Sequence, residues 1–557
     1  MRAMTHAGLA LAVTWAAFAP MQAQGQTSPA APTGGSLQQQ PALLPPLAAP
    51  HNDIQLLPGT AAPEPGFAVS QGLKVLVRSV RITGASVYTD AQLQPLLADQ
   101  LGQELDFSQL QALARRITAH YQSHGYLLAR ALLPAQKVSD GVVEIKVEEG
   151  RLGKVRLQTQ APADPAVVEP HLGGLRALEG RVLQRAPLER ELLVLNDLPG
   201  VRLRSVLEPG TEEGTADLRV EVSAERRVDA SLILDNYGNR YTGEYRLTGR
   251  VLVSNPWRFG DSLDASLTYG FTGYRYGRAA WQTPVGSGGL QLGVAGSLMS
   301  YTLGKEFESL DAHGHAIDLT FYALQPLQRS RRQQLQAQLA LDLKRFDDSA
   351  NGATSTKRIL VLNGGLSSRV LYDAGALSQG SLSLSLGQLD LDATSAAGDA
   401  LGYRTEGGYL KLSGQGEYEH PLGGGLSGAL RLSGQVANKN LDSSEKFSLG
   451  GPQAVRAFAV GEVGADDALL GTLELRKRWG DTLGKLFVEG ARGRLAHDPL
   501  PSDSDNLRKF GAAGVGLDTR LPGDVLLQTA LAWRLSGSAS AHLDRNPRLW
   551  FLIAKNF

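Results

Sequence analysis

The chain has no cysteine among its 557 residues. This absence excludes a disulfide framework, a thiolate metal site and a cysteine nucleophile. The sequence also has no excess of one charge, because 55 basic side chains balance 55 acidic ones. A basic excess is typical of proteins that bind nucleic acid. We therefore expect no nucleic-acid partner.

Long apolar runs are missing too. Beyond the N-terminus, no stretch reaches the roughly eighteen unbroken apolar residues that a membrane-spanning helix needs. Residues 1–23 resemble a secretory signal peptide, with a basic start at Arg2 and His6, an apolar core over Ala7–Ala19 and a cleavage site at Met21-Gln22-Ala23. We expect its removal. An exported chain without a spanning helix is periplasmic, secreted or a β-barrel.

Motifs of enzymes are equally scarce. No GxxxxGK[ST] loop is present, so ATP cannot power this protein directly. The run Gly511–Gly516 has no βαβ context and favours a small-residue barrel strand. His313 and His315 are interpreted as loop residues without a third metal ligand. The sequence thus predicts no catalytic residue, no cofactor and no metal site, and an outer-membrane enzyme is a remote alternative.

Residues 24–73 are rich in proline, alanine and glutamine. Proline breaks helices, so this composition predicts a flexible tether. Within it, only Ser36–Gln40 and Ile54–Leu57 look helical, and they are the candidates for a short helix that plugs the barrel.

A mixed α/β pattern begins at Lys74. Val75–Ile82 alternates like a half-buried strand, and Thr89 and Asp90 are suited to cap a helix through Leu97. The spacing of apolar residues predicts a second helix over Phe107–His124. Its buried face consists of residues three and four apart: Leu110, Leu113, Ile117 and Tyr121. Two strands follow, over Leu127–Leu133 and Val142–Val147.

The same order then recurs over residues 151–224. A strand is predicted at Val155–Leu157, helices at Pro165–Leu172 and Leu188–Leu195, and a hairpin formed by Arg202–Glu208 and Ala216–Val222. Two consecutive βααββ units are an internal repeat of about 75 residues, a pattern typical of tandem recognition arrays.

From residue 225 to 557, glycine becomes frequent and period-two alternation dominates. Clear cases are Leu263–Phe271, Leu335–Leu343, Leu382–Leu386, Leu426–Val436 and Val525–Leu535. A soluble β-sandwich alternates as well, but a single core seldom extends over about 333 residues. A transmembrane barrel needs segments of about ten residues with apolar side chains outside and polar ones inside. Sixteen strands leave about 21 residues for each strand with its connection, although fourteen or eighteen fit nearly as well.

The chain ends in a strand-like alternation of Leu549, Phe551, Ile553 and Phe557. An aromatic C-terminal residue after such a strand is similar to the signal read by the barrel-assembly machinery. The alternative is an ordinary edge strand that happens to end in phenylalanine.

Several stretches resemble two-partner secretion transporters, the POTRA-plus-barrel family of haemolysin and haemagglutinin secretion and activation proteins. Tyr121–Gln136, Asp140–Ile145 and Val147–Gly150 resemble their first POTRA domain. Leu195–Val201, Ser205–Leu207 and Pro209-Gly210 resemble their second, and Asp235–Arg240 with Thr242-Gly243 resembles the entry to their first barrel strand.

Two shorter matches concern a site. Gly450–Phe458 is similar to the tip of the family's sixth extracellular loop, which folds back into the barrel lumen. Ala457 stands where the family has glycine, and alanine would be strained there if the backbone had a positive φ. Phe487-Val488-Glu489 resembles a strand motif in which the family usually has aspartate instead of Glu489. The resemblance implies that Val455, Arg456 and Phe458 act in gating and that Glu489 is their partner in the lumen.

A pairing of Arg456 with Glu489 also has a physical reason that does not depend on the family resemblance. An arginine inside a barrel is costly unless it is paired, and guanidinium with carboxylate forms strong charge-assisted hydrogen bonds. A contact between Arg456 and Glu489 would tether the loop to the wall. The residues alone favour the alternative, in which Arg456 is a solvated loop residue and Glu489 is one lumen charge among many; the resemblance reverses that preference.

The sequence therefore predicts α+β periplasmic domains, two POTRA units of βααββ order, followed by a transmembrane antiparallel β-barrel of sixteen strands. The expected divisions are a signal peptide (1–23), a tether (24–73), POTRA 1 (74–150), POTRA 2 (151–224) and the barrel (225–557). We expect a transporter in the bacterial outer membrane with its POTRA domains in the periplasm. It would recognise an unfolded partner exoprotein there and translocate it to the cell surface without nucleotide hydrolysis. The expected contacts are the exoprotein, outer-membrane lipid and, through Phe557, the barrel-assembly machinery. Alternatives are a barrel-assembly insertase of the same superfamily, which usually has more POTRA units, and a passive porin.

Overall fold

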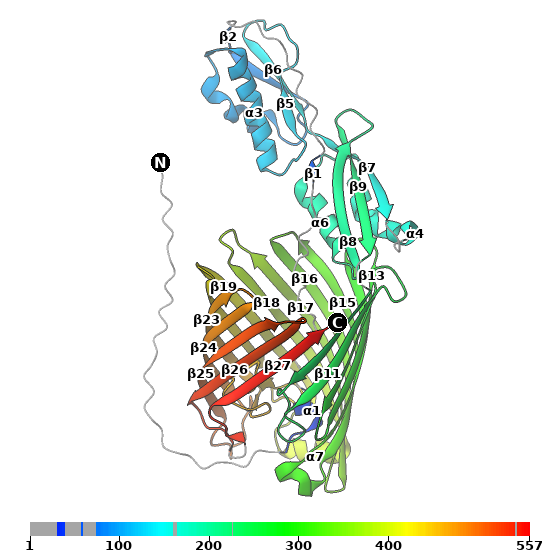
Figure 1. Ribbon diagram of the computed structural model, residues 1–557, viewed down its shortest axis with the longest axis vertical. Coiled ribbons are helices and arrows are strands. Elements are labelled where there is room, and N and C mark those ends of the chain that lie inside the picture. The colour runs from blue at the N-terminus through cyan, green and yellow to red at the C-terminus, as the bar shows by residue number, and fades with distance from the viewer. Residues whose placement is uncertain (1–30, 39–56, 59–73, 160–163, 225–226, 541–542) are drawn as a thin grey trace.

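The computed structural model describes residues 31–38, 57–58, 74–159, 164–224, 227–540 and 543–557. Two α/β units follow one another outward from one mouth of a β-barrel (Figure 1). The predicted signal peptide and most of the predicted tether lie outside the described residues. Within these residues, no helix is both long enough and apolar enough to cross a membrane.

The first α/β unit has a sheet of order β3-β6-β5, in which β6 pairs with β3 in parallel and with β5 antiparallel. Its elements are β2 (Val75–Leu76), β3 (Ser79–Thr83), α2 (Asp90–Leu93), β4 (Glu104–Leu105), α3 (Phe107–Ser123), β5 (Arg130–Leu132) and β6 (Val142–Glu148). Helix α3 matches its prediction within one residue, with Asp106 as its N-cap. Its predicted apolar face is buried against the sheet, where each large aliphatic side chain contributes about 1.5–3 kcal/mol.

Two predictions in this unit were wrong in detail. The strand expected over Val75–Ile82 is divided, because β2 pairs with β4 and the chain then turns to pair β3 with β6. The helix expected through Leu97 is a single α-turn with Thr89 as its N-cap, followed by 3₁₀ turns over Gln94–Leu96 and Ala98–Gln100. Pro95 accounts for the change, because it has no amide to continue α-helical bonding.

Glu149, just after β6, is a buried carboxylate that joins α3 to the sheet. It accepts hydrogen bonds from the Val87 amide at 2.7 Å, the Tyr121 hydroxyl at 2.9 Å, and both the amide and the hydroxyl of Ser86. Burial alone would raise the pKa of Glu149, but these donors outweigh burial and hold the pKa below its usual range.

We expect Glu149→Gln to destabilise this unit by about 1–3 kcal/mol, because a neutral amide accepts these bonds less well. A lowered folded-state pKa stabilises above the unfolded value of about 4.3 and loses that contribution as pH falls through the folded pKa. Hydrogen exchange of the α3 amides in the full chain should therefore accelerate in the variant at pH 7. As the pH falls below 4, the difference from the parent protein should shrink. Equal exchange at pH 7 would contradict the assignment.

The second α/β unit repeats this topology. Its sheet has the order β1-β8-β9-β7, in which β9 pairs with β7 in parallel and with β8 antiparallel. The elements are β7 (Arg151–Thr159), α4 (Pro165–Val168), a 3₁₀ turn (Glu169–Leu172), α5 (Gly173–Arg176), α6 (Arg185–Asn196), β8 (Val201–Pro209) and β9 (Thr215–Ala224). Strand β1 (Leu57–Pro58) adds to the outer edge of β8 in parallel. Leu57, expected to be helical, is thus in a strand, because its backbone pairs with β8; Ile54, Gln55 and Leu56 lie outside the described residues.

The barrel closes with sixteen antiparallel strands, as predicted. They are β10 (Val228–Asp235), β11 (Arg246–Ser254), β12 (Ser262–Gly270), β13 (Tyr274–Val285), β14 (Leu290–Thr302), β15 (His313–Arg329), β16 (Gln333–Ala350), β17 (Ala353–Leu371), β18 (Leu377–Leu391), β19 (Gly407–Gly423), β20 (Leu426–Ala437), β23 (Asp467–Trp479), β24 (Thr482–Arg494), β25 (Leu507–Leu521), β26 (Val525–Ser536) and β27 (Arg548–Asn556). Closure is made by β10 and β27, paired from Ser231↔Asn556 to Asp235↔Leu552.

Alternation divides each strand between two environments. On β16, Leu339, Leu341 and Leu343 are exposed on the outer face, whereas Gln338 and Asp342 are buried toward the lumen. Gly511–Gly516 lies within β25, as predicted. His313 and His315 belong to β15 and not to a loop, because both pair with strand partners on β14 and β16. Among the described residues, no group of three or more histidines or carboxylates is arranged to hold a metal ion.

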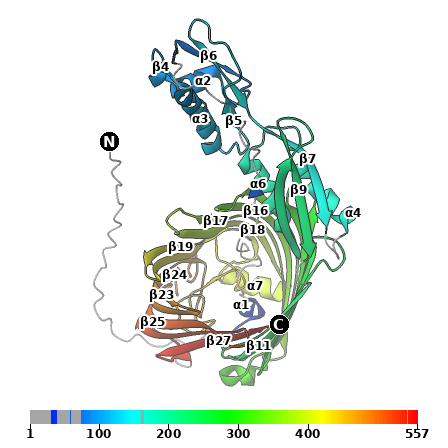
Figure 2. The ribbon, with the colours of Figure 1, turned by 45° about the horizontal axis from the view of Figure 1, so that its top comes forward.

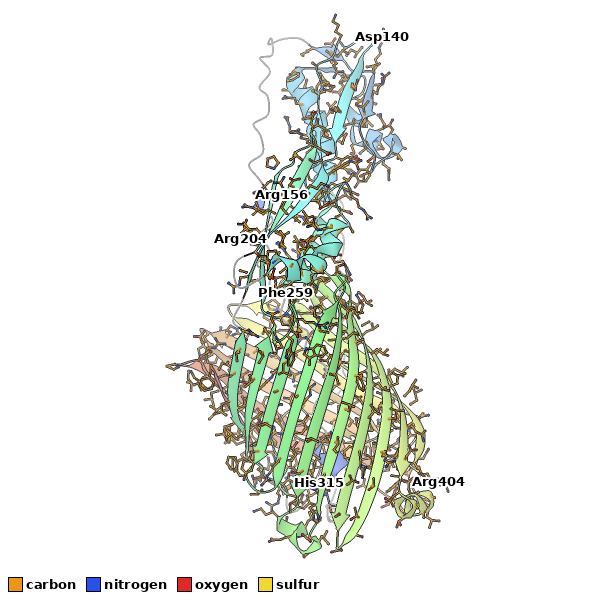
Figure 3. All side chains as sticks on the ribbon, turned by 90° about the vertical axis from the view of Figure 1, so that its right-hand side faces the viewer. Asp140, Arg156, Arg204, Phe259, His315 and Arg404 are labelled. Carbon is orange, nitrogen blue, oxygen red and sulfur yellow. The ribbon has the colours of Figure 1, made fainter. Side chains whose placement is uncertain are left out.

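The two ends of the barrel differ. Connections next to the α/β units are short, such as 330–332 and 424–425, whereas the far end has long loops. These loops include 392–406, with helix α7 (Ala393–Leu401), and 438–466, with the short strands β21 (Phe447–Ser448) and β22 (Gly464–Ala465). In Figure 3, Phe259 marks the end next to the units, and His315 and Arg404 lie toward the other end.

The second unit is docked on the barrel through its helix α6. Asp197, directly after α6, receives Nε and Nη2 of Arg329 at 2.6 and 2.7 Å, and the Glu189 carboxylate accepts the Arg331 amide at 2.8 Å. The Arg329 side chain is only 2% exposed. A bidentate pair of this kind fixes both distance and orientation.

We expect Asp197→Ala to loosen the attachment of the two α/β units to the barrel mouth, because the lost ion pair weakens this docking by about 1.5–3 kcal/mol. Spin labels placed on the first unit and on a loop at the far end of the barrel should give a broadened distance distribution. Arg332→Ala is a suitable control, since Arg332 neighbours the same turn and its side chain is 64% exposed. An unchanged distribution in Asp197→Ala would show that the apolar contacts alone hold the two units.

Candidate functional site

The lumen wall formed by β23 and β24 carries charges at alternate positions. Glu474 and Arg476 on β23, and Glu489 on β24, are all buried. They are inward-facing residues, because the outward positions between them are exposed leucines and valine: Leu473, Leu475 and Val488. Buried charges of this kind require partners.

The partner of this wall is the long connection between β20 and β23, which we call loop six (residues 438–466). It is the sixth loop at the end away from the α/β units. A two-residue ladder between β21 and β22 forms its neck. Beyond the neck, the tip (residues 450–458) folds back on itself through hydrogen bonds from Val455 N to Leu449 O at 3.1 Å and from Gly451 N to Phe458 O at 3.1 Å.

Arg456 at the tip contacts two glutamates of the wall. Its Nε donates to Glu489 Oε1 at 2.6 Å, and its backbone amide donates to Glu489 Oε2 at 2.8 Å. Its Nη2 donates to Glu474 Oε1 at 2.8 Å. The Arg456 side chain is 10% exposed, and those of Glu474 and Glu489 are 5% and 2% exposed, so this contact excludes most solvent.

Aromatic rings complete the seat of the tip. The guanidinium carbon of Arg456 lies 3.4 Å from the ring centroid of Phe487, a cation–π contact. Phe458 stacks on Phe510 at 3.8 Å, and Trp550 Nε1 donates to the Arg456 carbonyl at 2.7 Å. Gly514 on β25 leaves room for the Phe487 ring, with which any Cβ at position 514 would collide.

The ion pairs continue along the wall beyond the tip. Arg476 contacts Glu474 and Glu417 at 2.7 Å each and Glu419 at 2.6 Å, and Arg431 approaches Glu417 at 3.4 Å. Three arginines therefore face four glutamates when Arg456 and Glu489 are included. The network therefore contains one more carboxyl group than guanidinium groups, and Arg456 is the basic side chain that loop six supplies to it.

The N-terminal segment also enters the lumen. Helix α1 (Gly34–Leu37) lies inside the barrel (Figure 2). The Gly34 amide donates to Asp348 Oδ1 at 3.0 Å, and Thr33 Oγ1 lies 2.8 Å from Ser443 Oγ of loop six. The stretch Ser36–Gln40 was predicted to be helical. Its first two residues, Ser36 and Leu37, form the end of this one-turn helix, whereas Gln39 and Gln40 lie outside the described residues.

The structure brings all four predicted site residues together. Val455 and Phe458 are fully buried beside Arg456, and Glu489 faces them from β24. Ala457 is buried and has no positive φ, so the alanine is not strained. Sequence reasoning missed Glu474, Phe510 and Trp550. The period-two pattern of β23 signals only that Glu474 faces the lumen, and nothing in the sequence pairs it with Arg456.

Comparison with known proteins places this arrangement in a family. Residues 75–150 match the model of the ShlB-type POTRA domain, and residues 214–489 match that of the haemolysin secretion/activation protein ShlB/FhaC/HecB. Together the two matches cover more than half of the chain. This chain belongs to the ShlB/FhaC/HecB family. It is an outer-membrane transporter with a periplasmic POTRA domain, and its family consists of transporters.

Individual relatives agree over most of the length. The heme/hemopexin transporter protein HuxB of Haemophilus influenzae is 26% identical over 501 residues, covering 87% of this chain and 88% of HuxB. The outer membrane transporter CdiB of Escherichia coli is 29% identical over 273 residues, 44% of this chain and 45% of CdiB. The solved structure of CdiB from Escherichia coli superposes with a TM-score of 0.70 at 21% identity, covering 90% of this chain and 94% of that one.

Proposed function

We propose that this protein exports a partner protein from the periplasm to the cell surface through its barrel. One observation carries the proposal: loop six and helix α1 of the protein itself lie in the lumen, while the matched POTRA domain (residues 75–150) lies outward from one mouth, beyond the second α/β unit. A passive porin would lose conductance through such filling and would have no use for the unit. A regulated transporter needs both features.

The α/β units are the proposed site of client recognition. Strands β3 and β5 are the outer strands of the first sheet, so an extended client segment can pair with either edge by strand addition. The second unit has the same strand pairing, and we propose that it is a second POTRA domain. Because β1 already pairs with β8, a client at that edge would have to displace a piece of this chain.

Energy for export would come from the client itself. The sequence has no phosphate-binding loop, so nucleotide hydrolysis by this chain does not contribute. A client that folds outside can no longer slip back, which gives the movement its direction. The tip residues Val455, Arg456 and Phe458, together with Glu489, would hold the gate closed until a client arrives.

We further propose two contacts of the barrel exterior. The exposed leucines of the outer face contact outer-membrane lipid, since a barrel presents apolar side chains outward. The C-terminal strand β27, with Leu549 and Ile553 outward and Phe557 at the end 55% exposed, would be recognised by the barrel-assembly machinery.

An insertase of the same superfamily is the other candidate function. Two units of POTRA topology, the named transporters among the relatives and the occupied lumen favour export instead. The heme and hemopexin in the name of HuxB concern that protein, and the name of CdiB states only that it is an outer-membrane transporter. We transfer only the class of reaction, translocation of a protein client, to this chain.

Reconstitution tests the proposal. Purified full-length protein in liposomes should translocate an unfolded exoprotein encoded beside its gene, seen as protection of the client from external protease, without added nucleotide. Matched liposomes should give no protection for an unrelated unfolded protein of similar length. Insertion of other barrels into the bilayer without any client protection would favour the insertase.

A further inference from the structure

A second group of buried charges contacts loop six at residues that precede its tip. These are residues 441–446, which we call the stem. The Glu445 carboxylate receives Lys344 Nζ at 2.8 Å and Lys411 Nζ at 2.6 Å. Its side chain is only 4% exposed, and those of the two lysines are 18% and 13% exposed. One carboxylate is thus held between two wall strands, β16 and β19.

Neighbouring contacts reinforce this position. Asp442 pairs with Lys357 on β17 at 2.8 Å, and both side chains are nearly buried. The Gln435 amide donates to the Glu445 carbonyl at 3.0 Å. The stem therefore contacts three wall lysines through two acids, whereas the tip contacts two wall glutamates through one arginine.

The two sets of contacts lie on different sides of the place where the loop leaves the wall. Loop six emerges between β20 and β23. The wall lysines that the stem contacts lie on β16, β17 and β19. The wall residues that contact Arg456 and Phe458 lie on β23, β24, β25 and β27. Loop six consequently bridges two sectors of the wall. The stem offers acids to lysines and the tip offers an arginine to glutamates, so exchanging their positions would bring like charges together.

Thr33, the N-cap of helix α1, contacts the stem. Thr33 Oγ1 lies 2.8 Å from Ser443 Oγ, next to Lys357 Nζ, which is itself 3.3 Å from Ser443 Oγ. The N-terminal segment and the stem therefore share the same lysine-lined wall.

We propose that the stem is a second anchor of loop six, independent of the tip, and that Glu445 is its positioning residue through Lys344 and Lys411. Loss of the tip contact alone then leaves the loop attached within the lumen. Full opening requires release of both anchors. Only the consequence for export rests on the proposed function; the anchoring concerns the protein without a client.

Conductance of the full-length protein in planar bilayers tests the anchor without any client. Glu445→Gln keeps the shape of the side chain and removes its charge, so two lysines lose their shared partner. We expect the open probability to rise about tenfold, the factor that 1.4 kcal/mol supplies. Lys411→Met provides a second route to the same result should Glu445→Gln fail to show heat-modifiable migration. Lys485→Met is the matched control, because Lys485 pairs with Asp518 at 2.5 Å between two wall strands, with similar burial.

A position reporter separates loop movement from general loosening. The chain has no cysteine, so a single Ala459→Cys substitution, at a site 5% exposed, can be labelled cleanly. In Glu445→Gln, an impermeant maleimide added outside should react faster with this cysteine, while heat-modifiable migration stays normal. Arg456→Ala combined with Glu445→Gln should multiply the single effects on open probability, as independent sites do.

Two results would overturn the proposal. One is a Glu445→Gln protein that gates like Lys485→Met. The other is a double variant no more open than Arg456→Ala alone, which would make stem and tip a single anchor. Failure of client translocation with normal conductance effects would contradict the export function and leave the second anchor standing.

Discussion

Deletion of residues 74–224 is expected to reduce client export to background while leaving an inserted, ion-conducting barrel. The barrel closes on itself through β10 and β27, and each α/β unit has its own hydrophobic core. The second unit contacts the barrel at its short connections, through α6 and Asp197, and within the described residues no barrel strand pairs with it. Removing both units therefore takes away client recognition without opening the wall.

The measurement is surface display of the client in cells, together with bilayer conductance of the purified protein. Heat-modifiable migration on gels should confirm that the shortened barrel is folded. Asp197→Ala is a useful companion, because it keeps both units and alters only their attachment. Normal export by the deletion would remove the units from recognition.

Arg456→Ala is expected to have the second largest effect, with export lowered several-fold and conductance altered, but with folding and insertion retained. The substitution leaves Glu489 buried, and among the residues that the structure describes it retains the backbone amide of residue 456 as its hydrogen-bond donor. Stranding one charge of a fully desolvated pair costs about 3–5 kcal/mol, and water in the lumen reduces this value. The tip also loses its contact with the Phe487 ring.

Glu489→Ala should be milder than Arg456→Ala. The network already contains more glutamates than arginines, and Arg456 retains Glu474 when Glu489 is lost. The sequence alone predicts similar defects for the two, because it shows an isolated pair; the structure replaces that expectation with an asymmetric one. Arg456→Ala with Glu489→Ala should export no worse than Arg456→Ala, since the stranded carboxylate is removed as well.

The same export and conductance assays check this order. Arg431→Ala is a suitable control, because Arg431 belongs to the wall network and its side chain is 41% exposed. Additive defects of the two single substitutions would mean that Arg456 and Glu489 act separately. Wild-type export in Arg456→Ala would exclude the loop tip from gating.

Periodic features were predictable from the sequence. Helix α3 has a run of apolar residues at helical spacing, and the barrel strands alternate strictly, so burial alone determines which face each residue takes. The barrel itself was predictable, but the length alone did not fix its strand number, because fourteen or eighteen strands fit nearly as well as sixteen. The pair Arg456–Glu489 depended on the family resemblance, because the residues by themselves favoured a solvated arginine.

Contacts across strands were not predictable. Glu474 meets Arg456 only because β23 pairs with β24 in one register, from Asp467↔Arg494 to Trp479↔Thr482. His313 and His315 flank a glycine and read as a loop, yet the ladder with β14 and β16 extends through them. Leu57 takes part in a strand because of a partner about 150 positions away in the sequence, Val206, and no local pattern encodes such a partner.

Trp550, which holds the Arg456 carbonyl, lies on the last strand of the chain. Of the sixteen barrel strands it is the last to be synthesised, and its pairing with β10 completes the ring. The seat of the tip is therefore incomplete in any assembly intermediate whose final strand has not yet joined the first. During biogenesis, the tip of loop six can reach its full set of contacts only after β27 has paired with β10, so an unclosed wall and an incompletely seated tip occur together.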